Sequence, residues 1–234
     1  MPHRFFCSDL AESGSVALSD TEFHHLTHVL RHQVNDTVEL FNGTGLAATC
    51  RIAAIRKRDV ELEILSTQYS APPQKVLTLA TAVPKGDRFD WLIEKSTELG
   101  VSRLIPLTTT RSVVDPRASK LDKLRQTVMT ACKQSGRNHL MAISAVTSWH
   151  DFLHEFAVEH QILVAHPGGS SIDTILPQTM NANRPLAVAI GPEGGFDDEE
   201  VQVAINAGAT AIHLGQNILR IETAAIGLAA KLLL

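Results

Sequence analysis

The chain has 234 residues, of which 44% are hydrophobic and 20% are charged, and its formal net charge is −4. This composition is typical of globular proteins and excludes the disordered and fibrous classes. No apolar run reaches the roughly 18–20 residues of a membrane span, and the N-terminus lacks the apolar stretch of a secretory signal. The three cysteines are far apart and form no Cys-x-x-Cys pair. This usage favours a reducing, cytoplasmic location and argues against a disulfide framework or a cysteine-based zinc site.

Charge is segregated along the chain. Residues 71–150 hold 12 Lys and Arg against 6 Asp and Glu, whereas residues 151–234 hold 3 against 10. A basic block can bind a polyanion on one face even though the whole protein is acidic. Lys and Arg on solvated helix faces give the same segregated pattern, so charge alone neither establishes nor excludes nucleic-acid binding.

Residues 1–70 are predicted to form a small, mainly β domain. Asn42-Gly43-Thr44-Gly45 supplies the glycines of a hairpin turn, and the consecutive prolines Pro72 and Pro73 mark the end of a linker over residues 67–73. The expected elements are strands at Thr37–Phe41, Ala48–Ile55 and Val60–Ile64, an edge strand at Arg4–Phe6, and a helix at Asp20–Arg31.

From residue 75 onward strands and helices alternate, which predicts an α/β domain with a mainly parallel sheet covered on both faces. Gly100 is placed to end one helix, and the Ser148-x-x-Asp151 spacing is typical of the start of another. The expected strands are Val76–Val83, Arg103–Leu107, Ile143–Thr147, Ile162–Ala165, Leu186–Ile190 and Ala211–Leu214. The expected helices are Asp87–Leu99, Ser119–Ser135, Ser148–Glu159, Asp198–Ala207 and Glu222–Leu234.

Ligands of parallel sheets bind at the carboxyl ends of the strands, which directs attention to three loops. They are His166–Ser171, Gly191–Phe196 and Gly215–Thr223, and glycine in such loops lets a ligand approach the backbone. The helix after the second loop begins with the carboxylates of 197–200, which suit the helix dipole and are expected to form a cap, but repel a phosphate. No phosphate-binding glycine motif is present, so this loop is predicted to take a neutral or cationic ligand, such as a sulfonium.

The third loop carries two unusual features. Ile218 and Leu219 are apolar in an expected turn, where they either wall a ligand pocket or pack on the core. Arg220 is placed to steer a polar substrate, with an ion pair to Glu222 or Glu193 as the alternative.

Elsewhere, histidines at positions 24, 28 and 32 repeat at helical spacing, but no carboxylate or cysteine is clearly placed to complete a metal site. We therefore interpret them as an exposed helix face and predict no metal.

Several segments, in the right order along nearly the whole chain, resemble the bacterial 16S rRNA (uracil-N3)-methyltransferase family of the SPOUT superfamily. One departure is Ile221, where the family commonly has threonine. The segments that carry the resemblance are Ile190-Gly191-Pro192-Glu193-Gly194-Gly195-Phe196, Leu214-Gly215 with Ile218-Leu219-Arg220 and Glu222-Thr223-Ala224, Glu94-Lys95-Ser96-Thr97-Glu98-Leu99-Gly100-Val101, Gln134-Ser135-x-Arg137, and His25-Leu26 with Val29-Leu30-Arg31.

The resemblance implies a PUA-like RNA-binding β-barrel at residues 1–70 and a SPOUT methyltransferase domain at residues 75–234 with a C-terminal trefoil knot. It also implies S-adenosylmethionine as the cofactor, 16S rRNA in the small ribosomal subunit as the substrate, and a homodimer with no membrane association. Two alternatives stay open. One is another SPOUT enzyme, such as a ribose 2′-O-methyltransferase, which the N-terminal motif disfavours, and the other is a non-catalytic RNA-binding protein on a retained fold.

Site residues follow from the resemblance together with the loop analysis. We expect Arg220 to stabilise a uracil anion, and Glu193 or Glu222 to take a proton. The expected cofactor-binding residues are Ala165, His166, Ile190, Gly191, Gly194, Gly195, Leu214, Gly215, Ile218, Leu219, Thr223 and Ala224. The expected RNA-binding residues are Arg4, Arg31, Lys85, Arg88, Arg111, Lys133 and Arg137.

Overall fold

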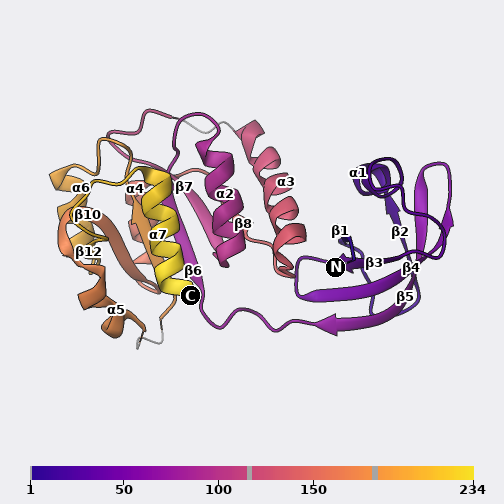
Figure 1. Cartoon of the computed structure of the whole chain (residues 1–234). Helices are drawn as coiled ribbons and strands as arrows, with labels where there is room; N and C mark the ends of the chain where they lie inside the picture. Colours follow the sequence, from indigo (N-terminus) through magenta and orange to yellow (C-terminus); the bar gives the residue numbers. More distant parts are fainter. Residues whose placement is uncertain (1, 115–117, 181–183) are drawn as a thin grey trace. The chain divides into compact units, whose positions relative to one another are not determined.

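The computed structural model describes residues 2–114, 118–180 and 184–234 (Figure 1), and the side chains of 118–121 and 178–180 are not described. The chain divides into two compact units. The N-terminal unit comprises Met1–Pro72 and Met129–Leu140, and the sheet unit comprises Pro73–Val128 and Met141–Leu234. The segment 129–140 is therefore grouped with strands that lie much earlier in the chain, within residues 4–69.

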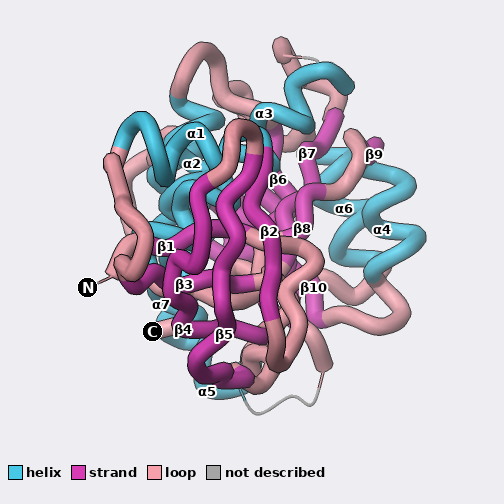
Figure 2. Tube along the Cα trace, turned by 90° about the vertical axis from the view of Figure 1, so that its right-hand side faces the viewer, coloured by secondary structure: helices cyan, strands magenta, loops and turns pink. Residues whose placement is uncertain are grey.

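The N-terminal unit is a five-stranded sheet in the order β1-β3-β4-β5-β2, whose strands lie side by side in Figure 2. Its neighbours are antiparallel except for β1 and β3, which are parallel. The sheet surrounds a core that includes the fully buried Phe5, Leu40 and Ile52. The mainly β prediction and the edge strand are confirmed. The strands are β1 (Arg4–Phe6), β2 (Ser15–Ser19), β3 (Thr37–Phe41), β4 (Leu46–Ile55) and β5 (Asp59–Tyr69).

The single helix predicted at Asp20–Arg31 is wrong in its second half. The α-helix α1 (Asp20–His24) passes into a π-helical turn, η1 (His25–Val29), in which the amide of Leu30 donates to the His25 carbonyl at 3.0 Å. Arg31 then has a φ of 57°, in the left-handed region. Leu26 in the π turn is fully buried, so core packing accompanies the departure from regular helical geometry. The sequence period alone does not distinguish the two kinds of turn.

The sheet unit holds a parallel sheet in the order β12-β10-β11-β6-β7-β8, with β9 also paired to β7. Every pair of neighbours in it is parallel, as predicted. The strands are β6 (Leu77–Ala82), β7 (Arg103–Thr108), β8 (Ala142–Ile143), β9 (Thr147–Ser148), β10 (Gln161–Ser171), β11 (Leu186–Ile190) and β12 (Thr210–His213).

Helices cover both faces of this sheet. Figures 1 and 2 show α2 and α7 on one face and α4 and α6 on the other. Packing on the second face is aromatic, with Trp149, Phe152 and Phe196 in one buried cluster. No helix in the described ranges is long and apolar enough to cross a membrane. The helices are α2 (Arg88–Leu99), α3 (Ala118–Ser135), α4 (Trp149–Phe156), α5 (Ile172–Met180), α6 (Asp198–Asn206) and α7 (Ile221–Leu233).

The structure differs from the predicted elements at three places in the sheet unit. The strand expected at Ile143–Thr147 is two short strands, β8 and β9, on either side of a bend. Strand β10 runs on to Ser171, through a segment predicted as a loop, and α5 then follows although no helix was expected there. Pro177 inside α5 weakens its helical signal in the sequence, which accounts for the miss.

Candidate functional site

A cavity of about 520 Å³ lies at the ends of β11 and β12 and at residues 165–167 of β10, where the pairing register of β10 with β12 begins to shift. These three strands are parallel neighbours, so their carboxyl ends share one edge of the sheet. All three of the predicted ligand segments contribute to the wall of the cavity. The residues lining it are Ala165, His166, Pro167, Ile190, Gly191, Pro192, Glu193, Gly194, Gly195, Ile212, His213, Leu214, Gly215, Gln216, Asn217, Ile218, Leu219, Ile221, Ala224 and Leu228.

Every residue predicted to bind a cofactor lines this cavity except Thr223, and Glu193 lines it as well. Sequence reasoning missed residues adjacent to the predicted ones, such as His213 at the end of β12 and Leu228 in α7. Leu228 lies one helical turn beyond Ala224, and this spacing was the available signal for it.

Glycine is required at two points in these segments. The pairing register of β10 with β12 shifts between Ala165 and Ser170. Within this segment, a Cβ on Gly169 would lie 2.4 Å from the carbonyl carbon of Ala211 in β12. Gly195 has a φ of +70°, which non-glycine residues rarely adopt, and a Cβ there would enter open space. The first glycine lets two strands approach closely, and the second makes a turn at the wall of the cavity.

The acidic start of α6 is a helix cap, as predicted. The side chain of Asp197 accepts a hydrogen bond from the amide of Glu200 at 2.7 Å, and Oε2 of Glu200 accepts one from the amide of Asp197 at 3.0 Å. The other oxygen of Glu200 accepts hydrogen bonds from the amide and the hydroxyl of Thr110. No sequence pattern predicts the hydrogen bonds between Glu200 and Thr110, because the two residues are 90 positions apart.

Ile218 and Leu219 lie at the cavity rather than in the core. Ile218 is 88% exposed and Leu219 is 40% exposed, yet both line the cavity. Of the two readings that the sequence left open, this geometry favours an apolar wall for a ligand with an apolar face.

The three candidate catalytic side chains are placed differently. Glu193 is exposed and lines the cavity. Arg220 precedes the first residue of α7 and is exposed, and its side chain makes no hydrogen bond or ion pair within the described part of the chain. Glu222 is buried and its Oε1 lies 3.8 Å from Nε of Arg88, while its Oε2 has no hydrogen-bond partner among the described residues. The ion pair considered between Arg220 and either glutamate is therefore not formed.

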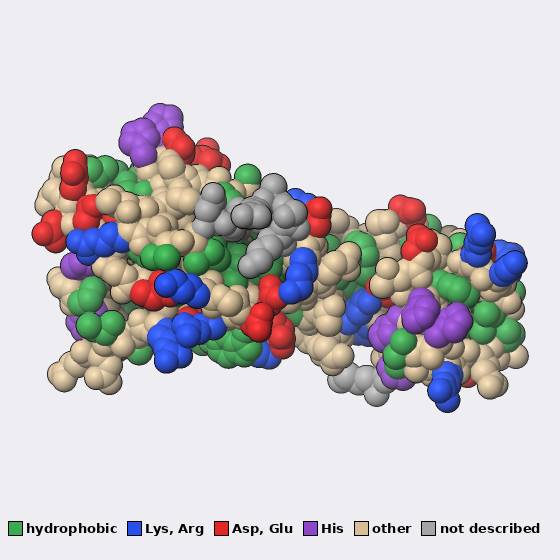
Figure 3. All heavy atoms as spheres, turned by 90° about the horizontal axis from the view of Figure 1, so that it is seen from above, with side chains coloured by type: hydrophobic (Ala, Val, Ile, Leu, Met, Phe, Trp, Pro, Cys, Tyr) green, Lys and Arg blue, Asp and Glu red, His purple; other side chains and the backbone are tan. Residues whose placement is uncertain are grey.

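The candidate RNA-binding cations divide into exposed and interior ones. Arg31, Lys85, Arg88 and Arg111 are exposed, although Arg88 faces Glu222 and Arg111 donates to a carbonyl beside the cavity. On the face drawn in Figure 3, Lys and Arg are interspersed with Asp and Glu. The basic block of the sequence is therefore not one continuous cationic patch on that face.

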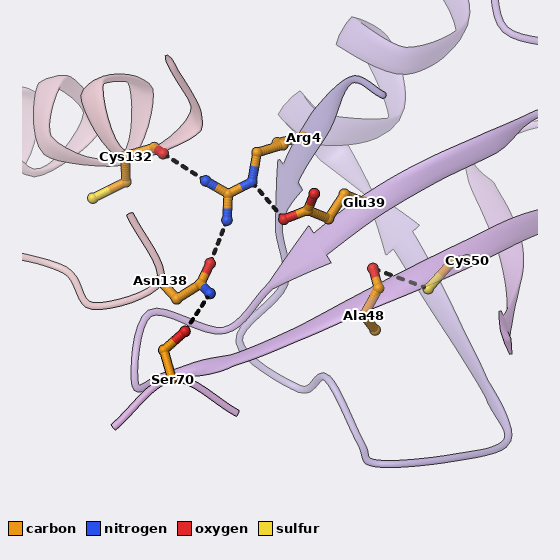
Figure 4. A network of polar contacts seen from close by, with 7 residues as sticks. All are labelled: Arg4, Glu39, Ala48, Cys50, Ser70, Cys132 and Asn138. Carbon is orange, nitrogen blue, oxygen red and sulfur yellow. Dashed lines mark hydrogen bonds and ion pairs between the residues drawn. The ribbon is translucent and has the colours of Figure 1, made fainter. Parts of the chain in front are cut away.

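Arg4, Lys133 and Arg137 lie inside the N-terminal unit, which corrects the prediction that they face RNA. Arg4 donates to Glu39, to the carbonyl of Cys132 and to Asn138, as Figure 4 shows. The ammonium group of Lys133 pairs with Glu22, and both side chains are largely buried. Burial lowers the pKa of Arg137. The spacing of charged residues along the sequence does not show which cations form hydrogen bonds or ion pairs inside the unit.

Histidine side chains gather on the N-terminal unit in Figure 3. His24 and His28 are exposed and stack at 4.8 Å between ring centroids, and Nδ1 of His32 lies 3.0 Å from a carboxylate oxygen of Asp36. Within the described ranges, no group of three or more His, Cys, Asp or Glu side chains is arranged to hold a metal ion.

Models of known protein families match both parts of the chain. An RNA methyltransferase domain model matches residues 71–233, and an RNA methyltransferase PUA domain model matches residues 18–65. The chain is 32% identical over 222 residues to the Ribosomal RNA small subunit methyltransferase E of Rickettsia conorii, covering 94% of this chain and 89% of the relative. The protein of the same name from Bacillus subtilis is 29% identical over 226 residues, covering 92% and 88%.

A solved structure has the same fold over almost the whole chain. It is the Ribosomal RNA small subunit methyltransferase E of Neisseria gonorrhoeae bound to S-adenosyl methionine, with a TM-score of 0.90 and 31% identity. The match covers 99% of this chain and 96% of the other. The parallel sheet and the small β unit therefore belong to one known architecture.

Proposed function

Because the chain belongs to the RNA methyltransferase family, we propose that it transfers a methyl group from S-adenosylmethionine to RNA of the small ribosomal subunit. The observation that carries the proposal is the cavity at the ends of β11 and β12 and at residues 165–167 of β10, which every expected cofactor residue but one lines. Its volume, about 520 Å³, lies within the range of small-molecule sites.

The chemistry of the cavity suits a sulfonium cofactor with an apolar face. Its wall combines exposed apolar side chains at 218 and 219 with glycine backbone at 191, 194 and 195. The acidic start of α6 follows the second loop and disfavours a phosphate there. Backbone groups would hold the polar parts of the cofactor, as they do in many sites where glycine permits close approach.

The target atom in this proposal is N3 of one uridine in 16S rRNA. This nitrogen carries a proton and lies on the Watson–Crick edge, so the base must be unpaired or displaced before reaction. N3 then loses its proton and forms a bond to the methyl carbon as the bond from that carbon to sulfur breaks. In-line alignment of the three atoms supplies much of the acceleration.

Arg220 has the role of stabilising the negative charge that develops on the uracil oxygens. It is exposed and unpaired among the described residues, and it lies in the chain between Leu219 and Ile221, which both line the cavity. A positioned cation at a developing anion is an effective source of rate enhancement. Glu193, at the cavity, and Glu222, buried beside Arg88, are the two candidates for accepting the N3 proton.

The N-terminal unit is proposed to bind the rRNA. A PUA domain model matches residues 18–65 within it, and Arg31 is an exposed cation there. The homodimer and the C-terminal trefoil knot that the resemblance implies, and the cytoplasmic location that the cysteine usage favours, remain parts of this proposal.

A methylation assay tests the proposed function. The full chain would be incubated with labelled S-adenosylmethionine and with small subunits lacking N3-methyluridine, and in parallel with naked rRNA from them. Mass spectrometry of the nucleosides would show N3-methyluridine if the proposal is correct. Another methylated nucleoside, such as a 2′-O-methylated one, would contradict the assignment to N3. Absence of transfer to either substrate, with the cofactor still bound, would favour a binding protein.

A further inference from the structure

The side chain of Arg111 lies against the glycine loop that walls the cavity. Its Nη1 donates a 2.7 Å hydrogen bond to the carbonyl oxygen of Gly194, 83 residues away. A Cβ on Gly194 would lie 3.3 Å from Cδ of Arg111 and 3.6 Å from its Cβ. The aliphatic stem of Arg111 therefore packs closely against position 194, and a methyl group there would require it to shift by a few tenths of an ångström.

The residue before Arg111 is hydrogen-bonded to the helix that follows the same loop. Thr110 donates to Oε1 of Glu200 through its amide at 2.8 Å and through its hydroxyl at 3.1 Å. Glu200 is buried and forms the cap of α6 with Asp197. Just beyond Arg111, the hydroxyl of Ser112 accepts a 2.9 Å hydrogen bond from the amide of Thr109, which closes a tight turn. One short turn thus contacts the loop at Gly194 and the helix that follows the loop at Glu200.

The loop is buried at both ends, at Gly191, Pro192 and Phe196, but hydrogen bonding within it is sparse. Between Gly191 and Phe196 the chain makes one internal backbone hydrogen bond, from the amide of Gly195 to the carbonyl of Pro192 at 2.8 Å. Consecutive glycines at 194 and 195 give the free loop many backbone conformations, and ordering them on binding would weaken affinity. A clamp that orders the loop beforehand removes part of that loss.

We propose that Arg111 is a positioning residue for the cofactor, which holds the Gly191–Phe196 loop in its binding shape before any RNA is present. This inference rests on the proposed function, since it takes the cavity to be the S-adenosylmethionine site. It differs from the expectation that Arg111 serves to contact RNA phosphates. A phosphate contact would affect RNA binding and its salt dependence, whereas a loop clamp affects the cofactor in the absence of RNA.

Calorimetric titration of the full chain with S-adenosylmethionine, without RNA, separates the two roles. We expect Arg111→Ala to weaken cofactor binding about tenfold, and Arg111→Lys to recover part of it because an ammonium can still donate to the carbonyl of Gly194. Arg125→Ala is the matched control, because Arg125 is an exposed cation that pairs with Asp122, three residues away. An unchanged cofactor affinity in Arg111→Ala, with a reduced salt slope of RNA binding, would overturn the inference.

Steady-state kinetics add a readout that general loss of structure would not reproduce. The Arg111→Ala variant should show a raised KM for S-adenosylmethionine and a nearly unchanged kcat at saturating cofactor, because a clamp contributes equally to ground and transition states. A fall in kcat with an unchanged KM would contradict a positioning role. The melting temperature of each variant shows whether the fold is retained.

A double-mutant cycle with Gly194→Ala tests the contact itself. The methyl group added at position 194 meets only the stem of Arg111 within 4 Å. Gly194→Ala should therefore weaken cofactor binding in the wild-type background and have no further effect in Arg111→Ala. Additive losses would overturn the inference. If the wild-type chain bound no S-adenosylmethionine, the proposed function would fail first, and this result is distinct from failure of the clamp alone.

Discussion

The carbonyl oxygen of Cys132 accepts a 2.9 Å hydrogen bond from Nη1 of Arg4, a residue 128 positions earlier in the chain. The same guanidinium donates from Nε to Glu39 at 2.8 Å, and its carbon lies 4.8 Å from the centre of the Phe41 ring. The Arg4 side chain is 10% exposed. These contacts join the end of α3 to the first strand of the N-terminal unit.

Replacing Arg4 by alanine should therefore destabilise the fold. The change leaves the carboxylate of Glu39 without its donor and removes one of two donors to the carbonyl of Cys132, the other being the amide of Arg137. Such losses at largely buried sites cost about 2–4 kcal/mol. Urea unfolding followed by circular dichroism would measure the effect. Arg51→Ala is the control, because its pair with Glu63 is about half exposed and should contribute less than about 1 kcal/mol. Equal effects of the two substitutions would contradict the assigned role of Arg4.

Gly195→Val should abolish cofactor binding. The residue lines the cavity at a φ of +70°, so a valine is both strained and placed in the open space beside the wall. Calorimetry with S-adenosylmethionine measures the loss. Gly208→Val is the matched control, because Gly208 has a φ of +89° and open space around it, but does not line the cavity. Both variants should lose stability, and only the first should lose affinity.

Features of the fold that depend on residues close together in the sequence could be predicted. The cap at Asp197 and Glu200 and the glycine end of α2 at Gly100 were predicted, because each depends on residues a few positions apart. The meeting of three loops at one edge was also predicted, since it follows from the parallel order of the strands.

Features that depend on distant partners were not predicted. The positions of Arg4 and Lys133 inside the N-terminal unit, and the contact of Arg111 with Gly194, need the tertiary structure. A charged residue looks the same in the sequence whether it faces solvent or a carbonyl oxygen. The π turn at η1 was missed for a related reason, since packing of Leu26 in the core decides its geometry.

RNA binding should depend on Arg31 and Lys85, which are both exposed. Each phosphate contact that is lost reduces the slope of log affinity against log salt by about 1. Fluorescence anisotropy with a small-subunit rRNA fragment, over a range of KCl concentrations, should show this reduction for Arg31→Ala and for Lys85→Ala. Lys57→Ala, an exposed cation outside the predicted set, provides the reference. Slopes that match the wild type would remove both residues from the RNA-binding surface.

Stability should decline at high pH partly through Cys50. Burial raises the pKa of its thiol from 9.0 to about 12. A group that holds its proton more tightly in the folded state stabilises the fold below its unfolded pKa, and this contribution is lost as the pH rises from about 9 towards 12. The free energy of unfolding, measured from pH 7 to pH 11, should fall less steeply for Cys50→Ala. Parallel curves for the variant and the wild type would exclude the thiol as a cause.

Arg220→Ala should abolish most of the turnover while leaving the cofactor bound. Arg220 does not line the cavity, but its neighbours in the chain do, so its loss should change the affinity for S-adenosylmethionine less than about twofold. Loss of a positioned donor at a developing anion typically lowers kcat about 10²–10³-fold. Single-turnover methylation of small subunits measures the chemical step directly. Arg220→Lys should recover part of the rate, because the cation is retained without the planar fork of the guanidinium. Full turnover in a folded Arg220→Ala variant would show that another group stabilises the uracil anion.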